Sequence, residues 1–291
     1  MGDGVYRAVN TLGRVALRAL RVDVVASGLE NLPRTGPVIL AANHVSYPDF
    51  VFIEKAAVQR GRYVRFLTRY DVWRPGVVAR AMDAMQHVPV DRSVPVAAYL
   101  RARNLLRTGE AVGIFPEAGI SYSYTVRSLM RGAAALAAET GAPVVPVAIW
   151  GGQRIFSVGD PEPPPDWTRG RRVDVTFGAP FSVAPGDDLV AVTTRLGHTL
   201  SGMLEELQLL PVHRPRPGEH ATWYPAHLGG HAPTLEAARV LDVVPSSAVT
   251  PTWGPGAPAS PAPSRSDRPA PSGHGTRTTR TAPEPAPPLR G

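Results

Sequence analysis

His44 and Asp49 are the first two residues in the sequence that could carry out chemistry together. They lie five residues apart in the segment NHVSYPD, between an apolar run at residues 38–42 and a helical pattern that begins near Pro48. At this spacing the loop can fold back so that the carboxylate meets one imidazole nitrogen, fixes the tautomer and supports a positive charge on the ring. The pair therefore predicts a general base. The alternative is that Asp49 only caps the helix and that His44 has a local structural role.

Other polar residues also follow apolar runs. Glu117 comes directly after such a run in the segment GEAVGIFPEAGIS, Arg131 lies near the start of the next helical pattern, and Arg92 follows the short segment HVPV. Because the carboxyl ends of parallel strands meet at one edge of a sheet, where α/β proteins bind ligands, we expect these residues to lie near His44 and Asp49. Taken singly, Arg92 could pair with a surface acid and Glu117 could be a helix-start acid.

An alternation of strands and helices must position these residues. We expect strands at residues 22–26, 38–42, 64–68, 111–115, 144–150 and 173–177. We expect helices at residues 5–20, 50–59, 75–85, 96–106, 129–139 and 189–207. This order is typical of the α/β class, and it predicts a single domain with a largely parallel mixed sheet flanked by helices.

The composition divides the chain into four parts. Residues 1–21 form a basic amphipathic helix, which either lies in a membrane interface or covers the core as an ordinary surface helix. Residues 22–210 form the α/β domain, and residues 211–250 form a turn-rich extension on its surface. Residues 251–291 contain 11 prolines and very few aliphatic side chains, so we expect a disordered tail.

The overall composition limits the classes of function. The net charge of +7 suggests an anionic partner, but the basic residues are scattered and no nucleic-acid-binding motif is present, so we expect no nucleic acid. The chain has no cysteine and no Gly-x-Ser-x-Gly segment, which argues against a covalent intermediate on a thiol or serine. No apolar run approaches the roughly 18–20 residues that a membrane-spanning helix needs. Four histidines in the extension match no familiar metal-binding spacing, so we expect no metal; they are His213, His220, His227 and His231.

The order of four motifs resembles the glycerolipid acyltransferase superfamily, which includes glycerol-3-phosphate and lysophosphatidic acid acyltransferases. The motifs are His44-x4-Asp49, Val-Asp-Arg92, Phe-Pro-Glu117 and Val-Pro-Val-Ala148. The resemblance implies a glycerol-3-phosphate acyltransferase-like fold. It implies an enzyme that moves a fatty acyl group from acyl-CoA or acyl carrier protein to the hydroxyl of a lysophospholipid, with 1-acylglycerol-3-phosphate as the acceptor, in phospholipid biosynthesis.

The resemblance also assigns roles to individual residues. The catalytic residues would be His44 and Asp49. The acceptor-binding residues would be Arg92, Glu117 and Arg131. The strand residues associated with binding the acyl donor or the acceptor would be Val145, Pro146 and Val147. Apart from the acyl-CoA or acyl carrier protein co-substrate we expect no cofactor, since a thiol is a good leaving group. With the lysolipid in a bilayer, we expect a peripheral protein on the cytoplasmic face of the plasma membrane.

The third motif departs from the family pattern. The family has Phe-Pro-Glu-Gly-Thr-Arg-Ser where this chain has FPEAGIS, so Ile120 replaces an arginine. An arginine fork is well suited to binding a phosphate, so its loss leaves two explanations. Either Arg92, Arg127 and Arg131 bind the phosphate, or the acceptor is a glycolipid or another lipid without a phosphomonoester. A catalytically impaired lipid-binding protein of the same fold is a further alternative, against which the intact histidine–aspartate pair argues.

Overall fold

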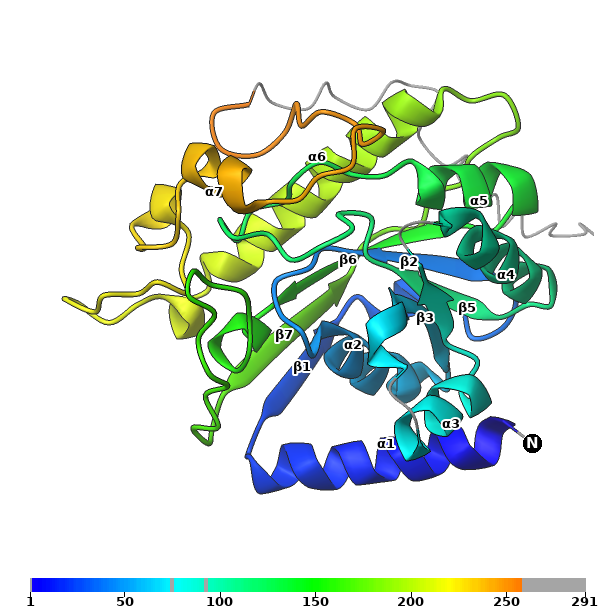
Figure 1. The fold of residues 1–291 in the computed structure, drawn as a ribbon, viewed down its shortest axis with the longest axis horizontal. Coiled ribbons are helices and arrows are strands. Elements are labelled where there is room, and N and C mark those ends of the chain that lie inside the picture. The colour runs from blue at the N-terminus through cyan, green and yellow to red at the C-terminus, as the bar shows by residue number, and fades with distance from the viewer. Residues whose placement is uncertain (1, 74–75, 92–93, 258–291) are drawn as a thin grey trace, which may run out of the picture. The chain divides into compact units, whose positions relative to one another are not determined.

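A seven-stranded sheet forms the centre of the computed structural model (Figure 1), which describes residues 2–73, 76–91 and 94–257. Its strands lie in the order β1-β7-β6-β2-β5-β3-β4. Their bounds are β1 Asp23–Ser27, β2 Val38–Ala42, β3 Val64–Arg69, β4 Val88–Val90, β5 Ala111–Ile114, β6 Val144–Trp150 and β7 Arg172–Phe177. All neighbours pair in parallel except β6 and β7, which are antiparallel. The predicted α/β fold with a largely parallel mixed sheet is thus confirmed.

Continuous apolar runs form the centre of the sheet. Every residue of β2 and β6 is buried, which is the pattern expected of parallel-type strands covered by helices on both faces. All six strands expected from the sequence are present, with ends that differ by one residue at most. Strand β4 was not predicted, because a segment of three residues is too short to show a strand pattern.

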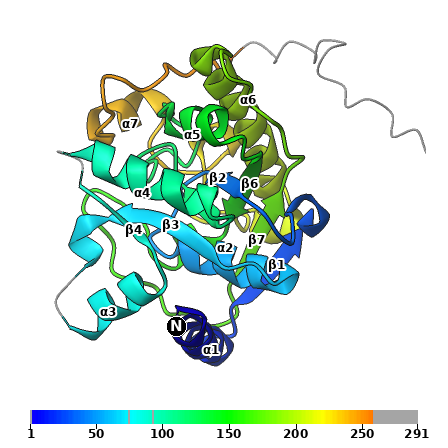
Figure 2. The same ribbon diagram turned by 90° about the vertical axis from the view of Figure 1, so that its right-hand side faces the viewer.

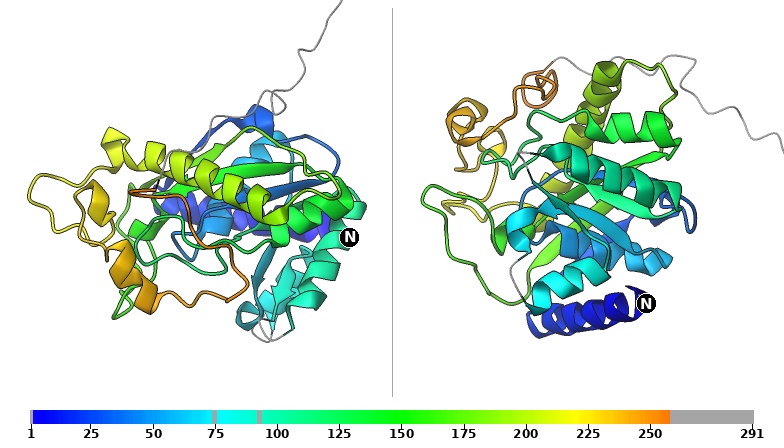
Figure 3. Two further views of the ribbon diagram at one scale, coloured as in Figure 1. Left: turned by 90° about the horizontal axis from the view of Figure 1, so that it is seen from above. Right: turned by 45° about the vertical axis from the view of Figure 1, so that its right-hand side comes forward.

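Helices cover both faces of the sheet (Figures 1 and 2). Their bounds are α1 Gly2–Ala19, α2 Asp49–Ala57, α3 Val77–Ala84, α4 Pro95–Arg107, α5 Gly132–Thr140, α6 Leu189–Gln208 and α7 Leu235–Leu241. Helices α4, α5 and α6 lie on one face and α2 lies on the other, with α1 packed outside α2 and α3. In Figure 3 the yellow-green α6 lies along the sheet, the yellow segment lies beyond one of its ends, and the orange segment runs back alongside it.

The N-terminal helix α1 does not pack through its most apolar face. Tyr6 is 1% exposed and its hydroxyl donates a 2.6 Å hydrogen bond to the carbonyl oxygen of Val64. By contrast, Val5, Leu12 and Val15 are 38%, 71% and 56% exposed. The ordinary surface-helix alternative, in which the apolar stripe covers the core, is therefore wrong for these three side chains. Among the described residues, no helix is both long enough and apolar enough to cross a bilayer.

Residues 211–250, which we call the C-terminal extension, bury several side chains against the sheet. The ring Nε2 of His213 lies 2.7 Å from Oδ2 of Asp174 on β7, and the histidine is 1% exposed. The hydroxyl of Tyr224 donates to the carbonyl oxygen of Gln208 at 2.8 Å, and its ring is part of the main core. The C-terminal extension is therefore attached to the α/β domain by buried polar and aromatic contacts.

The prediction of a disordered tail at residues 251–291 is wrong for residues 251–257. Trp253 is 4% exposed and belongs to the main core, and its indole Nε1 donates to the carbonyl oxygen of Val126 at 3.2 Å. The proline-rich composition gave no sign that one large aromatic side chain could fix this segment. Residues 258–291 lie outside the described residues.

Candidate active site

The loop between β2 and α2 carries the predicted histidine–aspartate pair. Strand β2 ends at Ala42 and α2 begins at Asp49, so the loop lies at the carboxyl end of a central strand. The Asn43 side chain fixes the start of this loop: its Nδ2 donates to the carbonyl oxygen of Ile149 at 3.1 Å, and its Oδ1 accepts from the Ile149 amide at 2.8 Å. The side chain thereby extends the pairing of β2 with β6 by one further step.

Within this loop, His44 and Asp49 meet as the spacing predicts. Nδ1 of His44 lies 2.9 Å from Oδ2 of Asp49, whose side chain is fully buried. The same oxygen accepts hydrogen bonds from the amides of Val45 and Ser46 at 2.7 and 2.8 Å. The hydroxyl of Ser46 donates to the other oxygen, Oδ1. These donors compensate the buried carboxylate charge and hold it in one orientation.

The contact with Asp49 determines which nitrogen of His44 can act as a base. Because the ionised carboxylate only accepts hydrogen bonds, Nδ1 carries the proton and Nε2 keeps its lone pair. The ring stacks on Phe115 with centroids 4.1 Å apart and an angle of 18° between the planes, and the side chain is 18% exposed. The imidazole is thus fixed in position and still reachable from solvent.

Glu117 binds the backbone of the loop that carries His44. It follows β5, the neighbour of β2, and is 1% exposed. Oε1 accepts from the amide of His44 at 2.8 Å, and Oε2 accepts from the amide of Arg127 at 3.0 Å. Burial raises the pKa of Glu117 to about 7, although the bonds from Arg127 and His44 lower it. Both oxygens accept hydrogen bonds from the backbone inside the protein, and the predicted binding of an acceptor by Glu117 stays a prediction.

Arg127 is also held inside the protein. Its Nη1 lies 3.0 Å from Oδ1 of Asp242, and its Nε and Nη2 donate to the carbonyl oxygen of Glu117 at 3.2 and 2.9 Å. The guanidinium lies against Gly119, where a Cβ would be 2.2 Å from Nη2. Arg127 therefore occupies the space next to Ile120, which is itself 7% exposed. The idea that Arg127 binds an acceptor phosphate is not supported, because its side chain is buried and paired.

Arg131 remains as an exposed cation of the predicted site. It is the residue before α5, and the neighbouring amide of Met130 donates to the carbonyl oxygen of Pro116 at 2.7 Å, which brings it beside the Phe-Pro-Glu motif. Arg92 lies outside the described residues. The remaining predicted residues are all buried in β6 between β2 and β7; they are Val145, Pro146 and Val147. Their predicted association with binding of the acyl donor or the acceptor stays a prediction, and all three side chains are buried.

The sequence did not identify three residues that support the pair. Ser46 and Phe115 lie inside the quoted motifs, and their short spacing to His44 and Glu117 could have identified them. Gly152 lies far away in the sequence. A Cβ at this position would be 2.3 Å from Oγ of Ser46 and 3.1 Å from Oδ1 of Asp49, so only glycine fits without displacing them. No local sequence signal predicts this contact.

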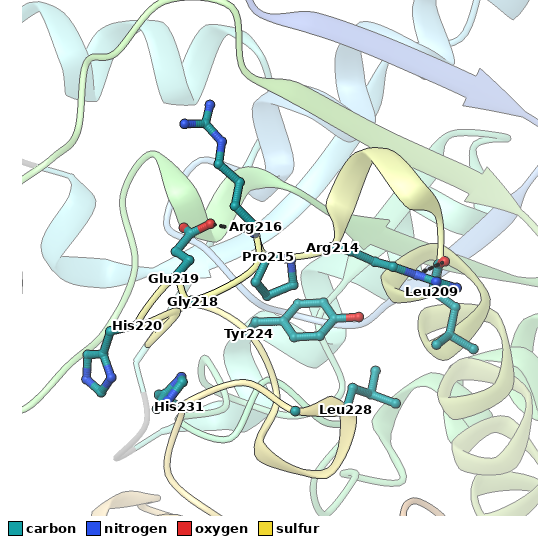
Figure 4. A pocket seen from close by; sticks show the side chains of 11 residues that line it. Leu209, Arg214, Pro215, Arg216, Gly218, Glu219, His220, Tyr224, Leu228 and His231 are labelled. Atoms are coloured by element: carbon teal, nitrogen blue, oxygen red, sulfur yellow. Dashed lines mark hydrogen bonds between the residues drawn. The ribbon is translucent and has the colours of Figure 1, made fainter.

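Two histidines of the C-terminal extension, His220 and His231, line a separate cavity (Figure 4). The cavity has a volume of about 760 Å³, and residues between Leu209 and His231 line it. The rings of His220 and His231 lie 4.2 Å apart there. Among the described residues, no group of three or more His, Asp or Glu side chains could hold a metal ion. None of the predicted catalytic residues lines this cavity.

Part of the chain is similar to a known protein family. Residues 23–150 match the sequence model of the acyltransferase family, a segment that begins at β1 and ends at the last residue of β6. It contains the histidine–aspartate pair and the Phe-Pro-Glu motif. The similarity of this segment to the acyltransferase family agrees with the resemblance that the order of the motifs indicates.

Several characterised proteins are similar to parts of this chain. A chloroplastic 1-acyl-sn-glycerol-3-phosphate acyltransferase of Brassica napus, BAT2, is 32% identical over 136 residues, which are 45% of this chain and 38% of that protein. The 1-acyl-sn-glycerol-3-phosphate acyltransferase of Borreliella burgdorferi is 26% identical over 147 residues, which are 49% of this chain and 57% of that protein. The chain thus spans less than two thirds of the length of these relatives.

A solved structure has a similar fold. The 1-acyl-sn-glycerophosphate acyltransferase PlsC from Thermotoga maritima superposes with a TM-score of 0.60 at 24% identity, over 70% of this chain and 79% of that chain. At this identity the likeness concerns the fold alone. It agrees with the arrangement of helices around the largely parallel sheet described above.

Proposed function

We propose that this protein transfers a fatty acyl group from an acyl thioester to the hydroxyl of a lysophospholipid, with 1-acylglycerol-3-phosphate as the acceptor, in phospholipid biosynthesis. The observation that carries the proposal is the contact between His44 and Asp49, with Nδ1 and Oδ2 2.9 Å apart and the histidine side chain 18% exposed. The names of the similar proteins support the same acceptor.

The geometry supports direct transfer by general base catalysis. Nε2 of His44 removes the proton from the acceptor hydroxyl, and Asp49 stabilises the imidazolium that forms. The oxygen attacks the thioester carbonyl carbon and forms a tetrahedral intermediate. This intermediate collapses with cleavage of the C–S bond, and the thiolate takes the proton from His44. General base catalysis of this kind contributes roughly 10²–10⁴-fold to the rate. Positioning of the two substrates must supply the remainder.

An exposed cation supports a phosphorylated acceptor. Arg131 lies next to the Phe-Pro-Glu motif, and its side chain is open to solvent, whereas Arg127 is buried and paired. We infer that Arg131, together with Arg92, binds the acceptor phosphate, and that Glu117 acts only through the loop of His44. A glycolipid or another acceptor without a phosphomonoester would not need Arg131. The acyl carrier is either coenzyme A or acyl carrier protein.

The exposed stripe of α1 supports a membrane partner. Val5, Leu12 and Val15 leave apolar surface open, and Arg7, Arg14 and Arg18 are exposed on the same helix. Apolar and basic groups together favour adsorption of a helix to an anionic lipid surface. The proposed protein is therefore peripheral, on the cytoplasmic face of the plasma membrane, where its lysolipid acceptor resides.

A product analysis tests the proposal. The purified protein is incubated with acyl-CoA or acyl carrier protein thioesters and a panel of lysolipids in vesicles, and the products are identified by mass. We expect a diacylated phosphatidic acid with the wild type and none with His44→Ala. Acylation of a glycolipid alone would change the acceptor and keep the chemistry. Binding of lysolipid without turnover would support the lipid-binding alternative.

A further inference from the structure

A buried ion pair connects the C-terminal extension to the catalytic domain. Asp242 follows α7 directly, and its Oδ1 lies 3.0 Å from Nη1 of Arg127. The same oxygen accepts from the amide of Tyr122 at 3.4 Å. The side chains of Arg127 and Asp242 are each 7% exposed. Ion pairs so far from solvent cost desolvation energy, and removing one partner leaves an uncompensated charge.

Arg127 passes this connection on to Glu117. Its guanidinium donates twice to the carbonyl oxygen of Glu117, and its backbone amide donates to Oε2 of the same residue at 3.0 Å. The other carboxylate oxygen of Glu117 accepts from the amide of His44 at 2.8 Å. Contacts between neighbouring side chains therefore run from Asp242 through Arg127 and Glu117 to the backbone of His44.

This chain of contacts ends at the backbone amide of His44, so it can affect the position of the base. The loop after β2 can present the imidazole correctly only if its backbone is fixed, and small misplacements of a catalytic group cost on the order of 10²-fold in rate. Glu117 supplies the hydrogen bond to the amide of His44 itself. Its own position depends on Arg127, which would lose its charge partner without Asp242.

We propose that Arg127 and Asp242 are positioning residues for the acyl transfer: Asp242 orients Arg127, Arg127 holds Glu117, and Glu117 holds His44. The inference rests on the proposed function, but it adds residues that touch no substrate. Asp242 lies outside the matched segment 23–150. The C-terminal extension then helps to position His44 through Asp242.

The test compares two buried ion pairs. Asp242→Asn removes the charge from the pair with Arg127, and Asp174→Asn removes it from the pair that Asp174 forms with Arg172 and His213. The first pair joins the C-terminal extension to Arg127, and the second joins it to strand β7 through His213. Only the first pair is connected to His44 by further contacts. We expect Asp242→Asn to lower kcat by about 10- to 100-fold with unchanged KM for both substrates. We expect Asp174→Asn to lower thermal stability and to leave kcat unchanged.

A spectroscopic readout separates positioning from simple destabilisation. The titration of the His44 imidazole is followed by NMR and assigned by its absence in His44→Ala. We expect Asp242→Asn to shift it and Asp174→Asn to leave it unchanged. We also expect the double variant Asp242→Asn, Glu117→Gln to be no slower than Glu117→Gln alone, since both act through the same contact. An equal effect of the two aspartate variants on kcat and on the titration would overturn the inference.

Two provisions keep the test decisive. If Asp242→Asn does not fold, Arg127→Lys replaces it, because the single ammonium nitrogen of a lysine cannot take the places of Nη1 at Asp242 and of Nε and Nη2 at Glu117. A folded Arg127→Lys with wild-type kcat and titration overturns the inference. If the wild type acylates no acceptor, the proposed function fails, and the titration of His44 alone then decides whether Asp242 positions the imidazole.

Discussion

Trp253 lies directly over Gly197 in the middle of α6, so closely that a Cβ on the glycine would be 2.4 Å from the indole Cδ2. The indole also donates to the carbonyl oxygen of Val126, between the Phe-Pro-Glu motif and α5. A segment that looks like a tail in the sequence therefore fills a gap between a helix and the loop that carries Arg127. Only a residue without a side chain on α6 leaves room for this ring.

We expect Trp253→Ala to lower the free energy of unfolding by about 3–5 kcal/mol, because it removes a large aromatic side chain from the core. A chain that ends at Thr250 should lose a similar amount. A chain that ends at Ala257 keeps the tryptophan and should melt at the wild-type temperature, since the sequence after it contains very few aliphatic side chains that could be buried. Thermal and urea unfolding measure all three. Equal stability of the two truncated chains would show that the contact of Trp253 contributes nothing.

Replacing the base should abolish turnover without unfolding the protein. His44→Ala removes the proton acceptor, and we expect kcat to fall by at least 10²–10⁴-fold. Asp49→Asn should lower kcat by nearly as much, because an amide in place of the acceptor oxygen no longer fixes the tautomer of His44. Steady-state kinetics, with circular dichroism to confirm the fold, measures both. A variant that lacks His44 and retains wild-type turnover would contradict the mechanism.

Glu54 should make stability depend on pH. This side chain is 6% exposed and accepts hydrogen bonds from Nδ2 of Asn10 at 3.2 Å and from the amide of Val64 at 3.0 Å. Burial raises its pKa from 4.5 to about 7. A carboxyl whose pKa is higher in the folded state contributes stability that is complete below the unfolded pKa. That contribution is lost as the pH rises through the folded pKa.

The free energy of unfolding of the wild type should therefore fall, relative to Glu54→Gln, between about pH 4.5 and 7, and the difference should stay constant at higher pH. The full change amounts to roughly 3 kcal/mol at 1.4 kcal/mol for each pKa unit. A glutamine can still accept from Val64 and donate to Asn10. Glu117 has a raised pKa as well and titrates in both proteins, so the comparison removes its effect. Parallel pH profiles would contradict the prediction.

Arg131 should affect the acceptor more than the donor. If it binds the acceptor phosphate, Arg131→Ala loses a charged hydrogen bond of about 1.5 kcal/mol, or roughly a 10-fold rise in the KM of a phosphomonoester acceptor. The KM of the thioester should not change. Arg101 on α4 is also exposed, and Arg101→Ala is the matched control. A rise in the thioester KM alone would place Arg131 at the donor instead.

The sequence predicted the parts of the site that depend on short spacings. The contact between His44 and Asp49 follows from their spacing of five residues where a strand leads into a helix, and the strands follow from apolar runs. The role of Glu117 was not predicted, because the orientation of its carboxylate depends on Arg127 and on Asp242 at the far end of the chain. Contacts between distant segments leave no pattern in either segment.

The same limit explains why the sequence left two alternatives open for α1. Helical periodicity groups Leu12 and Val15 into one apolar stripe, but it does not show which face meets the protein. Tyr6 sets which face of the helix meets the protein, because its ring stacks on Tyr63 with centroids 4.4 Å apart and its hydroxyl donates to the carbonyl oxygen of Val64. Burying a tyrosine with a satisfied hydroxyl fixes the orientation of the helix, and Leu12 and Val15 remain exposed.

That exposed stripe predicts how the protein meets a bilayer. Burying a leucine or valine side chain contributes about 1.5–3 kcal/mol, so a charge at either position should weaken binding to anionic vesicles by roughly 10-fold or more. We expect Leu12→Glu and Val15→Glu to lose binding in a vesicle flotation assay and to keep the wild-type melting temperature, because neither side chain packs in the core. Val190 is exposed on α6, across the sheet from α1, and Val190→Glu is the matched control for the added charge. If all three variants bind vesicles equally, α1 is not the membrane contact, and the acceptor lipid must be reached through another surface.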